Sequence, residues 1–316
     1  MTSRVTAVDG LLVLMVVFWG ANYSVIKRAF AEIPPQPFNA LRLTIASVVF
    51  LAAIRIARRR ARVAGAQLSS ALYTPHELTR RDRVDLVWLA LIGHCAYQFC
   101  FASGVALTSV SNAALIIGAT PVVVAILSAA LGRERISAMH WIGAAISASG
   151  IYLVVGHGAS FGGATLHGDL LMLLSVACWA VYTLAGSRLI ARHSPLYVTG
   201  MSMVIGTVPY LLIVAPQFAS VHWGAVSAWT WTALVLSALL ALCVAYTVWY
   251  AAVRRLGAAR TAIYSNAVPL AAMAVAAVWL HERMTPIKIA GATAVILGVA
   301  LTRLGRKSPV VVAIEE

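Results

Sequence analysis

The stretches ATPVVVAILSAALGRERIS (119–137) and AVPLAAMAVAAVWLHERMT (267–285) repeat one pattern along this chain. In the first stretch Glu134 follows Pro121 by thirteen residues (134 − 121 = 13), and in the second Glu282 follows Pro269 by the same interval (282 − 269 = 13). Each glutamate precedes an arginine and ends an apolar run close to the length that spans a membrane. The copies lie 148 residues apart (282 − 134 = 148), which indicates an internal duplication.

A second match, at an offset of 160, relates the beginnings of the two copies. Matching residues at this offset include Asp9 with Asp169, Trp19 with Trp179 and Arg28 with Arg188 (169 − 9 = 160). We therefore predict two homologous domains, residues 1–157 and 158–316. Five membrane spans are expected in each, and because five is odd, the second domain would cross the membrane in the opposite sense. Inverted repeats of this kind are typical of secondary transporters.

The composition is that of a chain embedded in a membrane. Of its 316 residues, 61% are hydrophobic and only 11% are charged, and the mean hydropathy is +0.87. Apolar runs of roughly 20 residues cross a bilayer as helices. Such runs are expected at 9–28, 35–57, 85–105, 110–131, 138–156, 168–190, 195–215, 228–252, 258–280 and 286–304. The predicted fold is an all-α integral membrane protein with ten transmembrane helices in two inverted five-helix repeats around a central cavity.

The net charge of +14 follows membrane topology rather than a nucleic-acid surface. With the N-terminus inside, 19 of the 24 Lys and Arg residues face the cytoplasm. The exceptions are Lys27, Arg28, Arg42, Arg283 and Lys288. The positive-inside rule then places both termini of a multi-pass protein in the cytoplasm. The lipid bilayer is an expected partner and nucleic acid is not, because a nucleic-acid surface would gather its basic residues on one folded face.

Enzymatic signatures and cofactor motifs are missing from the sequence. The four cysteines all lie within expected spans and form no CxxC pair, so we expect neither a disulfide nor a metal site. The nearest zinc motif, His281-Glu282, lacks the second histidine of HExxH. An intramembrane enzyme is therefore a remote alternative, and no cofactor is expected. Nothing in the sequence sets the oligomeric state, and a monomer is compatible with it.

Four of the expected helices carry polar or aromatic side chains at i, i+3 and i+4, which places each set on one face of its helix. The candidate cavity residues are Trp19, Asn22 and Tyr23 in 9–28; His94, Tyr97, Gln98 and Phe101 in 85–105; Trp179 and Tyr182 in 168–190; and Tyr246 and Trp249 in 228–252. By the 148 offset, Gln98 corresponds to Tyr246 and Phe101 to Trp249. A packing role, or for Trp249 a place in the aromatic belt at the headgroups, is the alternative.

An aromatic cavity with a few amides suits a flat or zwitterionic organic substrate, and it would also suit a cation through cation–π contacts. A phosphate fits poorly, because no expected span carries Lys or Arg at mid-depth. Pro121 and Pro269 each remove a backbone hydrogen bond, so we expect either hinges or static bends there. Arg42 could attract a substrate carboxylate, or it could snorkel outward or pair with Glu32. Glu134 and Glu282 could couple transport to protons, although interfacial salt bridging is the simpler interpretation.

The chain resembles the EamA-type branch of the drug/metabolite transporter superfamily over nearly its whole length. The resemblance rests on Trp19-Gly20-Ala21-Asn22, on Arg42 after Pro35, on ALTSVSNAALIIGATPVVVAILSAALGRERIS (106–137) and on its degenerate copy NAVPLAAMAVAAVWLHERMT (266–285). It implies ten helices, cytoplasmic termini, a central cavity between inverted repeats, and export or exchange of small metabolites. Within this branch, the aromatic faces are similar to those of the aromatic amino acid exporters.

The expected function is export of amino acids, aromatic and other neutral ones, and related small metabolites by alternating access. An exporter of organic cations or drugs is the alternative, although the expected spans carry no obvious acidic residue to pair with a cation.

Overall fold

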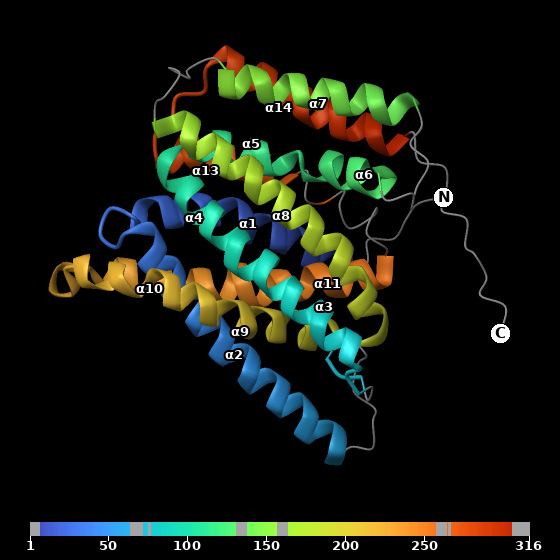
Figure 1. Cartoon of the computed structure of the whole chain (residues 1–316). Coiled ribbons are helices and arrows are strands. Elements are labelled where there is room, and N and C mark those ends of the chain that lie inside the picture. The colour runs from blue at the N-terminus through green and yellow to red at the C-terminus, as the bar shows by residue number, and fades with distance from the viewer. Residues whose placement is uncertain are drawn as a thin grey trace.

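The computed structural model describes residues 7–63, 72–74, 77–130, 138–156, 164–256, 264 and 267–304, and within these ranges the fold is helical with no strand. The helices before residue 160 are α1 (Ala7–Ala29), α2 (Pro35–Val63), α3 (Arg80–Ala90), the π-helical segment Leu91–Ala96, α4 (Tyr97–Leu107), α5 (Val110–Gly118), α6 (Thr120–Ala130) and α7 (Ala138–Gly156). They lie roughly side by side with the later helices in a single bundle (Figure 1).

The second part of the chain follows a similar order of elements. Its helices are α8 (Ala164–Arg192), α9 (Pro195–Val214), the 3₁₀ turns Ala215–Ser220 and Trp223–Ala225, α10 (Ala228–Leu236), the π-helical segment Ser237–Val244, α11 (Ala245–Leu256), α13 (Ala267–Trp279) and α14 (Pro286–Leu304). Six helical stretches in the described part of the chain are long and apolar enough to cross a membrane, and shorter apolar helices accompany them. The protein is therefore a multi-pass helical membrane protein.

Local sequence signals explain where several of these helices begin. Thr79 and Asp82 form a capping box at the start of α3, in which each side chain accepts a hydrogen bond from the backbone N–H of the other. Ser109, Ser194 and Ser227 cap α5, α9 and α10, and each hydroxyl oxygen accepts a hydrogen bond from a backbone N–H three residues later. These caps satisfy backbone donors that a helix end otherwise leaves without partners.

The predicted span 110–131 has an internal break that the apolar pattern did not reveal. The run 110–131 is divided at Ala119 into α5 and α6, so that Pro121 stands in the first turn of α6 rather than inside a continuous helix. The hydroxyl of Thr120 donates to the carbonyl of Ile117 at this break (2.5 Å), which supplies a partner for the carbonyl that the proline would leave free. Pro269 likewise stands in the first turn of α13.

Helices α7 and α14 form a closely packed antiparallel pair at one side of the bundle (Figure 1). A Cβ atom on Gly150 would lie 2.7 Å from the carbonyl oxygen of Gly291 and 2.8 Å from the backbone nitrogen of Val295. A Cβ atom on Gly298 would lie 2.5 Å from the carbonyl oxygen of Gly143 and from the nitrogen of Ser147. The two sets of contacts are reciprocal, because Gly298, Gly291 and Val295 follow Gly150, Gly143 and Ser147 by 148 residues (298 − 150 = 148).

Helices α2 and α9 form a second antiparallel pair. The hydroxyls of Ser47 and Thr207 hydrogen-bond across it at 3.0 Å, and these residues are separated by 160 positions (207 − 47 = 160). Further along, Gly200 packs on Phe50, while Tyr210 meets Asn39. Residue numbers therefore rise on one helix as they fall on the other, as in the α7–α14 pair.

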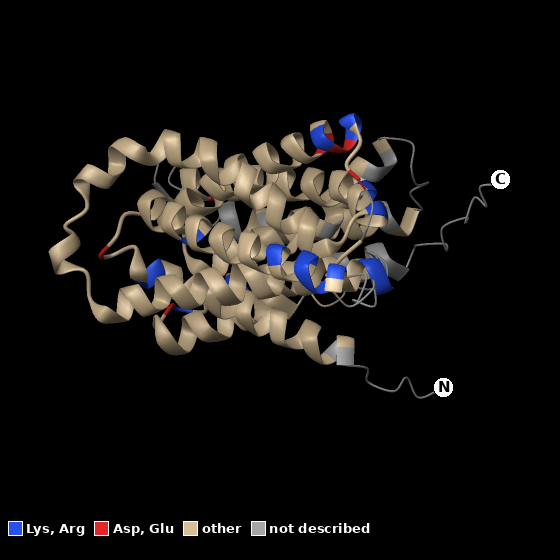
Figure 2. Ribbon diagram, turned by 90° about the horizontal axis from the view of Figure 1, so that it is seen from below, with Lys and Arg blue, Asp and Glu red and all other residues tan. Residues whose placement is uncertain are grey.

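The basic residues gather at one end of the bundle (Figure 2), where α2 and α8 end and α3 begins. We call it the basic end. Asp82 forms an ion pair with Arg192 there (3.2 Å). A cavity of about 630 Å³ lies at the same end, with Arg58, Arg62 and Arg83 among its lining residues. Helix α2 continues to Val63, six residues beyond the expected span 35–57, so Arg58 to Arg62 are helical (63 − 57 = 6).

Candidate functional site

The predicted aromatic faces of α1, α4, α8 and α11 meet in the middle of the bundle. We call the following group the aromatic cluster: Trp19, Tyr23, His94, Tyr97, Phe101, Trp179, Tyr182, Tyr246 and Trp249. Trp179 is at its centre, with ring centroids 5.2 Å from both Tyr97 and Tyr246 and 6.0 Å from Trp19. Trp19 also contacts Trp249 at 5.7 Å. The rings that were predicted from the helical spacing therefore lie together in the structure. All of them are buried except Trp19, which is half-buried.

The geometry of the cluster combines edge-to-face and stacked contacts. Trp179 meets Tyr246 at an interplanar angle of 85°, whereas Tyr97 stacks on Phe101 at 21°. Tyr23 then contacts Phe101 at 5.4 Å. Each such pair contributes about 0.5–1.5 kcal/mol beyond the burial of its area. A planar apolar group that entered here would meet ring faces and ring edges of the same kind.

Two π-helical segments shape the polar side of the cluster. Such segments are frequent at functional sites, because they disturb the regular backbone hydrogen bonding of a helix. The indole N–H of Trp19 donates to the carbonyl of Ala241 in the segment Ser237–Val244 (3.0 Å). His94, in the segment Leu91–Ala96, places its Nε2 3.1 Å from the hydroxyl of Ser202 and 3.3 Å from that of Tyr182.

The two predicted amides lie beside the rings. The hydroxyl of Ser237 donates to Asn22 Oδ1 (2.5 Å), and Gln98 Nε2 donates to the hydroxyl of Tyr246 (3.3 Å). Other buried polar atoms have no hydrogen-bond partner within the described residues, among them Gln98 Oε1 and Trp249 Nε1. An unpartnered buried polar atom costs about 1–3 kcal/mol, so such atoms need an explanation in a folded protein. A polar ligand between the helices would supply one.

Arg42 is buried, which sequence reasoning left open. Only 1% of its surface is exposed, and its Nη1 donates to Asn39 Oδ1 (3.0 Å). Because it is buried, Arg42 does not snorkel outward. It does not pair with Glu32 either, whose carboxylate accepts from the backbone N–H and the hydroxyl of Ser227. Asn39 in turn donates to the hydroxyl of Tyr210 (3.0 Å), and that hydroxyl donates to Gln36 Oε1.

Sequence reasoning did not identify Gln36, Asn39 and Tyr210. A signal was present in α2, since Gln36, Asn39 and Arg42 recur every third residue and share a face over two turns. Tyr210 had no comparable signal, because it follows Pro209 in an apolar run and has its polar partners on another helix.

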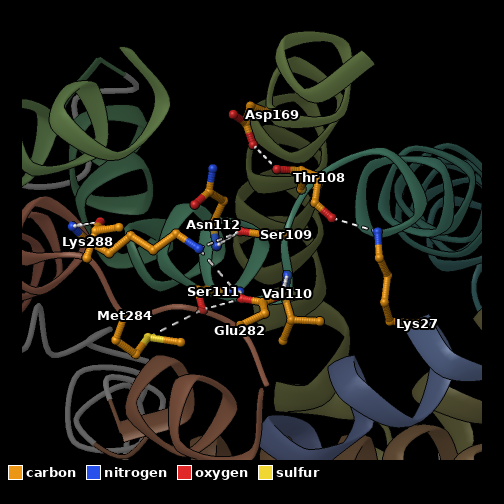
Figure 3. A network of polar contacts seen from close by, with 11 residues as sticks. Lys27, Thr108, Ser109, Val110, Ser111, Asn112, Asp169, Glu282, Met284 and Lys288 are labelled. Carbon is orange, nitrogen blue, oxygen red and sulfur yellow. Dashed lines mark hydrogen bonds and ion pairs between the residues drawn. The ribbon is translucent and has the colours of Figure 1, made fainter. Parts of the chain in front are cut away.

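Glu282 lies at the end of the bundle opposite the basic end, where α4 ends and α5 begins (Figure 1). There it caps α5 (Figure 3). Its carboxylate accepts from the backbone N–H groups of Val110 (2.7 Å) and Ser111 (3.2 Å) and from the hydroxyl of Ser111 (2.6 Å). Its ionic partner is Lys288 (3.7 Å), while the adjacent Arg283 is exposed. The salt bridge expected at this span end therefore exists, but its cation is Lys288.

Other polar contacts extend this arrangement to α1 and α8 (Figure 3). Lys27 Nζ donates to the carbonyls of Val105, Ala106 and Thr108, at 2.7 to 2.8 Å, and so caps the end of α4. The hydroxyl of Thr108 donates to Asp169 (2.5 Å). We call Lys27, Thr108, Ser109, Ser111, Asp169, Glu282 and Lys288 the far-end network. Because three of these residues come from beyond residue 160, the network joins the two parts of the chain.

Two predicted residues cannot be placed in full. Glu134 lies outside the described residues, and for Pro121 only the backbone is described. The part of the chain that the structure describes contains no group of three or more His, Cys, Asp or Glu side chains that could hold a metal ion.

Comparison with known proteins identifies the class. The model of the EamA-like transporter family matches residues 7–156 and again 166–304. A probable terminal-alkyne amino-acid exporter of Streptantibioticus cattleyicolor is 30% identical over 301 residues, covering 94% of each chain. An uncharacterised transporter of Bacillus subtilis, YyaM, is 29% identical over 90% of this chain and 89% of its own. A probable amino-acid metabolite efflux pump of Salmonella typhimurium is 26% identical over 94% of this chain and 95% of its own.

A solved crystal structure shares the fold, with a TM-score of 0.64 and 21% sequence identity, over 94% of this chain and 98% of that chain. The helical bundle and the relatives together define a multi-pass membrane transporter for small molecules rather than an enzyme. The chain belongs to the EamA-like transporter family.

Proposed function

We propose that this protein exports amino acids, aromatic and other neutral ones, together with related small metabolites, from the cytoplasm across the bacterial inner membrane by alternating access. The observation that carries the proposal is the aromatic cluster, buried where helices from both parts of the chain meet and accompanied by unpartnered polar atoms. Rings suit an apolar or aromatic side chain, and the polar atoms suit its charged ends. The printed names of two relatives, an amino-acid exporter and an amino-acid metabolite efflux pump, point the same way.

The same proposal assigns ten membrane helices to two inverted five-helix domains, residues 1–157 and 158–316. The reciprocal contacts of Gly150 and Gly298 support a two-fold relation between the domains, as does the hydrogen bond between Ser47 and Thr207. A residue on or near a two-fold axis touches its own counterpart, and both pairs of helices run antiparallel, as an axis in the membrane plane requires. The clustering of basic residues supports cytoplasmic termini.

Alternating access needs a closure that can open at each side of the membrane in turn. The far-end network supports this step, because it joins the domains at the end that would face the periplasm. Opening that end separates Glu282 from α5 and Asp169 from Thr108. Asp9 and Glu134 match Asp169 and Glu282 by the repeat offsets, so the sequence carries acidic residues for a corresponding closure at the cytoplasmic end. Pro121 and Pro269, each in the first turn of a helix, are the proposed hinges.

Efflux of labelled phenylalanine from proteoliposomes tests the proposal, with unlabelled amino acids as competitors and with or without a pH gradient. We expect saturable efflux that tryptophan inhibits, and acceleration by the gradient would show proton coupling. The double variant Trp179→Ala with Gln98→Ala removes the central ring and an amide that hydrogen-bonds Tyr246, so efflux should fall by about tenfold or more.

The matched control replaces the same residue types outside the cluster: Trp88→Ala with Gln217→Ala, both exposed in the structure. The control should transport as the wild type does. If the folded double variant exports every tested amino acid at the wild-type rate, the aromatic cluster is not the substrate site.

Export of organic cations is a second candidate, favoured by ring faces that attract a positive charge. The buried guanidinium of Arg42 counts against it, since it would repel a cation. Resistance of cells to quaternary ammonium dyes separates the two candidates, because only a cation exporter confers it.

A further inference from the structure

The charge of Arg42 has no counter-ion within the described residues. No carboxylate there forms an ion pair with it, its Nε has no hydrogen-bond partner, and its Nη1 donates to a neutral amide, that of Asn39. Removing a cation from water costs several kcal/mol unless an opposite charge accompanies it. Inside membrane segments such residues are rare and mark the paths of substrates or ions. The structure therefore contains a buried cation ready to receive an anion.

Arg42 lies next to the aromatic cluster. Asn39, its hydrogen-bond partner, also donates to the backbone carbonyl of Gln98 (3.4 Å), and Gln98 donates to the hydroxyl of Tyr246. A ligand held among the rings is therefore within the field of this charge.

The chemistry around Arg42 is that of a zwitterion site. Arginine donates two parallel hydrogen bonds to a carboxylate, which fixes the orientation of the ligand as well as binding it. Gln98 Oε1 is a buried acceptor without a partner, and the adjoining ring faces attract a cation. The repeat counterpart of Arg42 is Ser202 (42 + 160 = 202). Of these two matching positions, only the one on α2 therefore carries a positive charge.

We propose that Arg42 binds the carboxylate of the transported substrate, while Gln98 Oε1 and the neighbouring rings receive its ammonium group. This inference rests on the proposed function and adds the ligand class: α-amino acids and other carboxylates bearing an apolar or aromatic group. The carboxylate faces α2 in every transported molecule, because the second domain offers no equivalent cation at Ser202. Amines that lack a carboxylate are excluded.

Competition against labelled phenylalanine in the wild-type protein tests the inference without any mutation. Two analogues divide the substrate: 3-phenylpropionate lacks the ammonium group and 2-phenylethylamine lacks the carboxylate. We expect 3-phenylpropionate to inhibit, and 2-phenylethylamine to be about 100-fold weaker than phenylalanine, as loss of one member of a buried charge pair implies. Inhibition by the amine as strong as that by phenylalanine would overturn the assignment.

Variants at Arg42 provide a second readout. Arg42→Gln should abolish phenylalanine efflux, and Arg42→Lys should retain part of it, because a lysine keeps the charge without the planar fork. The control is Arg28→Gln, which removes an exposed arginine that lies over the rings of Trp229 and Trp279, and it should leave competition by both analogues unchanged. Wild-type efflux in folded Arg42→Gln would contradict the inference. If that variant does not fold, the analogue series decides.

Failure of the proposed function has a different signature. In that case the wild type transports no amino acid at all, and thermal stabilisation of the purified wild type by the two analogues then tests Arg42 directly. Stabilisation by 3-phenylpropionate and not by 2-phenylethylamine supports a carboxylate site for another class of substrate. Stabilisation by the amine, or by neither compound, overturns it.

Discussion

Glu32 connects the turn between α1 and α2 to the start of α10. Its carboxylate accepts from the backbone N–H (2.7 Å) and the hydroxyl (2.9 Å) of Ser227, the residue that caps α10. These hydrogen bonds, the backbone one first, hold the pKa of Glu32 below its ordinary value. A pKa lowered by folding adds stability above the ordinary glutamate pKa, and that stability disappears as the pH falls through the folded-state value.

Replacing this carboxylate should therefore have a pH-dependent effect. Glu32→Gln is expected to lower the thermal unfolding midpoint slightly at neutral pH and not at all at a pH below the folded-state pKa. Glu77→Gln, which changes an exposed glutamate elsewhere on the surface, provides the comparison in the same thermal scans. An equal difference between wild type and Glu32→Gln at both pH values would show that the charge on Glu32 contributes nothing.

Single residues also show how far the sequence could predict the site. Spacing at i, i+3 and i+4 was enough to select the rings that meet, because one face of a membrane helix must turn towards its neighbours. It could not show that Arg42 is buried, since a long side chain can reach the interface from the same helix position. The sequence could not identify the ionic partner of Glu282 either. Arg283 is adjacent in sequence, whereas Lys288 comes close to the carboxylate of Glu282 only in the folded chain.

At the level of elements, the α7–α14 pair depends on glycines that allow two backbones to touch. Small residues allow such close approach between membrane helices, where van der Waals contact replaces the hydrophobic effect. Leucine at Gly150 or Gly298 would collide with backbone atoms of the partner helix, which cannot rotate away as a side chain can. Each substitution should lower the free energy of unfolding by about 1–3 kcal/mol, and the double substitution should cost less than the sum.

Thermal or denaturant unfolding in detergent measures this loss. Gly10→Leu is the matched control, because Gly10 is also a helical glycine but has no atom within 4 Å of the Cβ position. It should leave stability unchanged or raise it slightly. If Gly150→Leu is as stable as Gly10→Leu, the two helices do not pack as described.

Elements also separate what was predictable from what was not. Apolar length located the six described stretches that are long enough to cross a membrane to within six residues at each end, since a span needs a minimum run of such side chains. The break at Ala119 and the two π-helical segments left no mark in that run, because apolar residues are as suitable in a regular helix as in a widened one. Proline marked the neighbourhood of the break, although the break precedes Pro121.

For the whole molecule, the far-end network sets how readily one side opens. Glu282→Gln keeps the shape of the side chain. It removes the negative charge that is attracted to the positive N-terminal end of α5, and it leaves one acceptor oxygen instead of two. We expect amide hydrogen exchange at Val110 and Ser111 to rise by about tenfold, the factor that corresponds to 1.4 kcal/mol. Exchange followed by mass spectrometry on peptides covering α5 measures the effect.

Glu32→Gln is the control for this prediction, because it changes a carboxylate that also accepts from a backbone N–H near the start of a helix, but outside the network. It should leave exchange at Val110 and Ser111 as in the wild type. Unchanged exchange in Glu282→Gln would mean that the network does not hold the two parts of the chain together.

The two π-helical segments occupy positions that match by the repeat offset of the sequence. Leu91–Ala96, moved forward by 148 positions, falls at 239–244, within the segment Ser237–Val244 (91 + 148 = 239; 96 + 148 = 244). A π-helical turn holds more residues than a regular α-helical turn, and such turns are frequent at functional sites. Because His94 lies in the first segment and Ala241 in the second, these matching positions place both widened turns against the aromatic cluster.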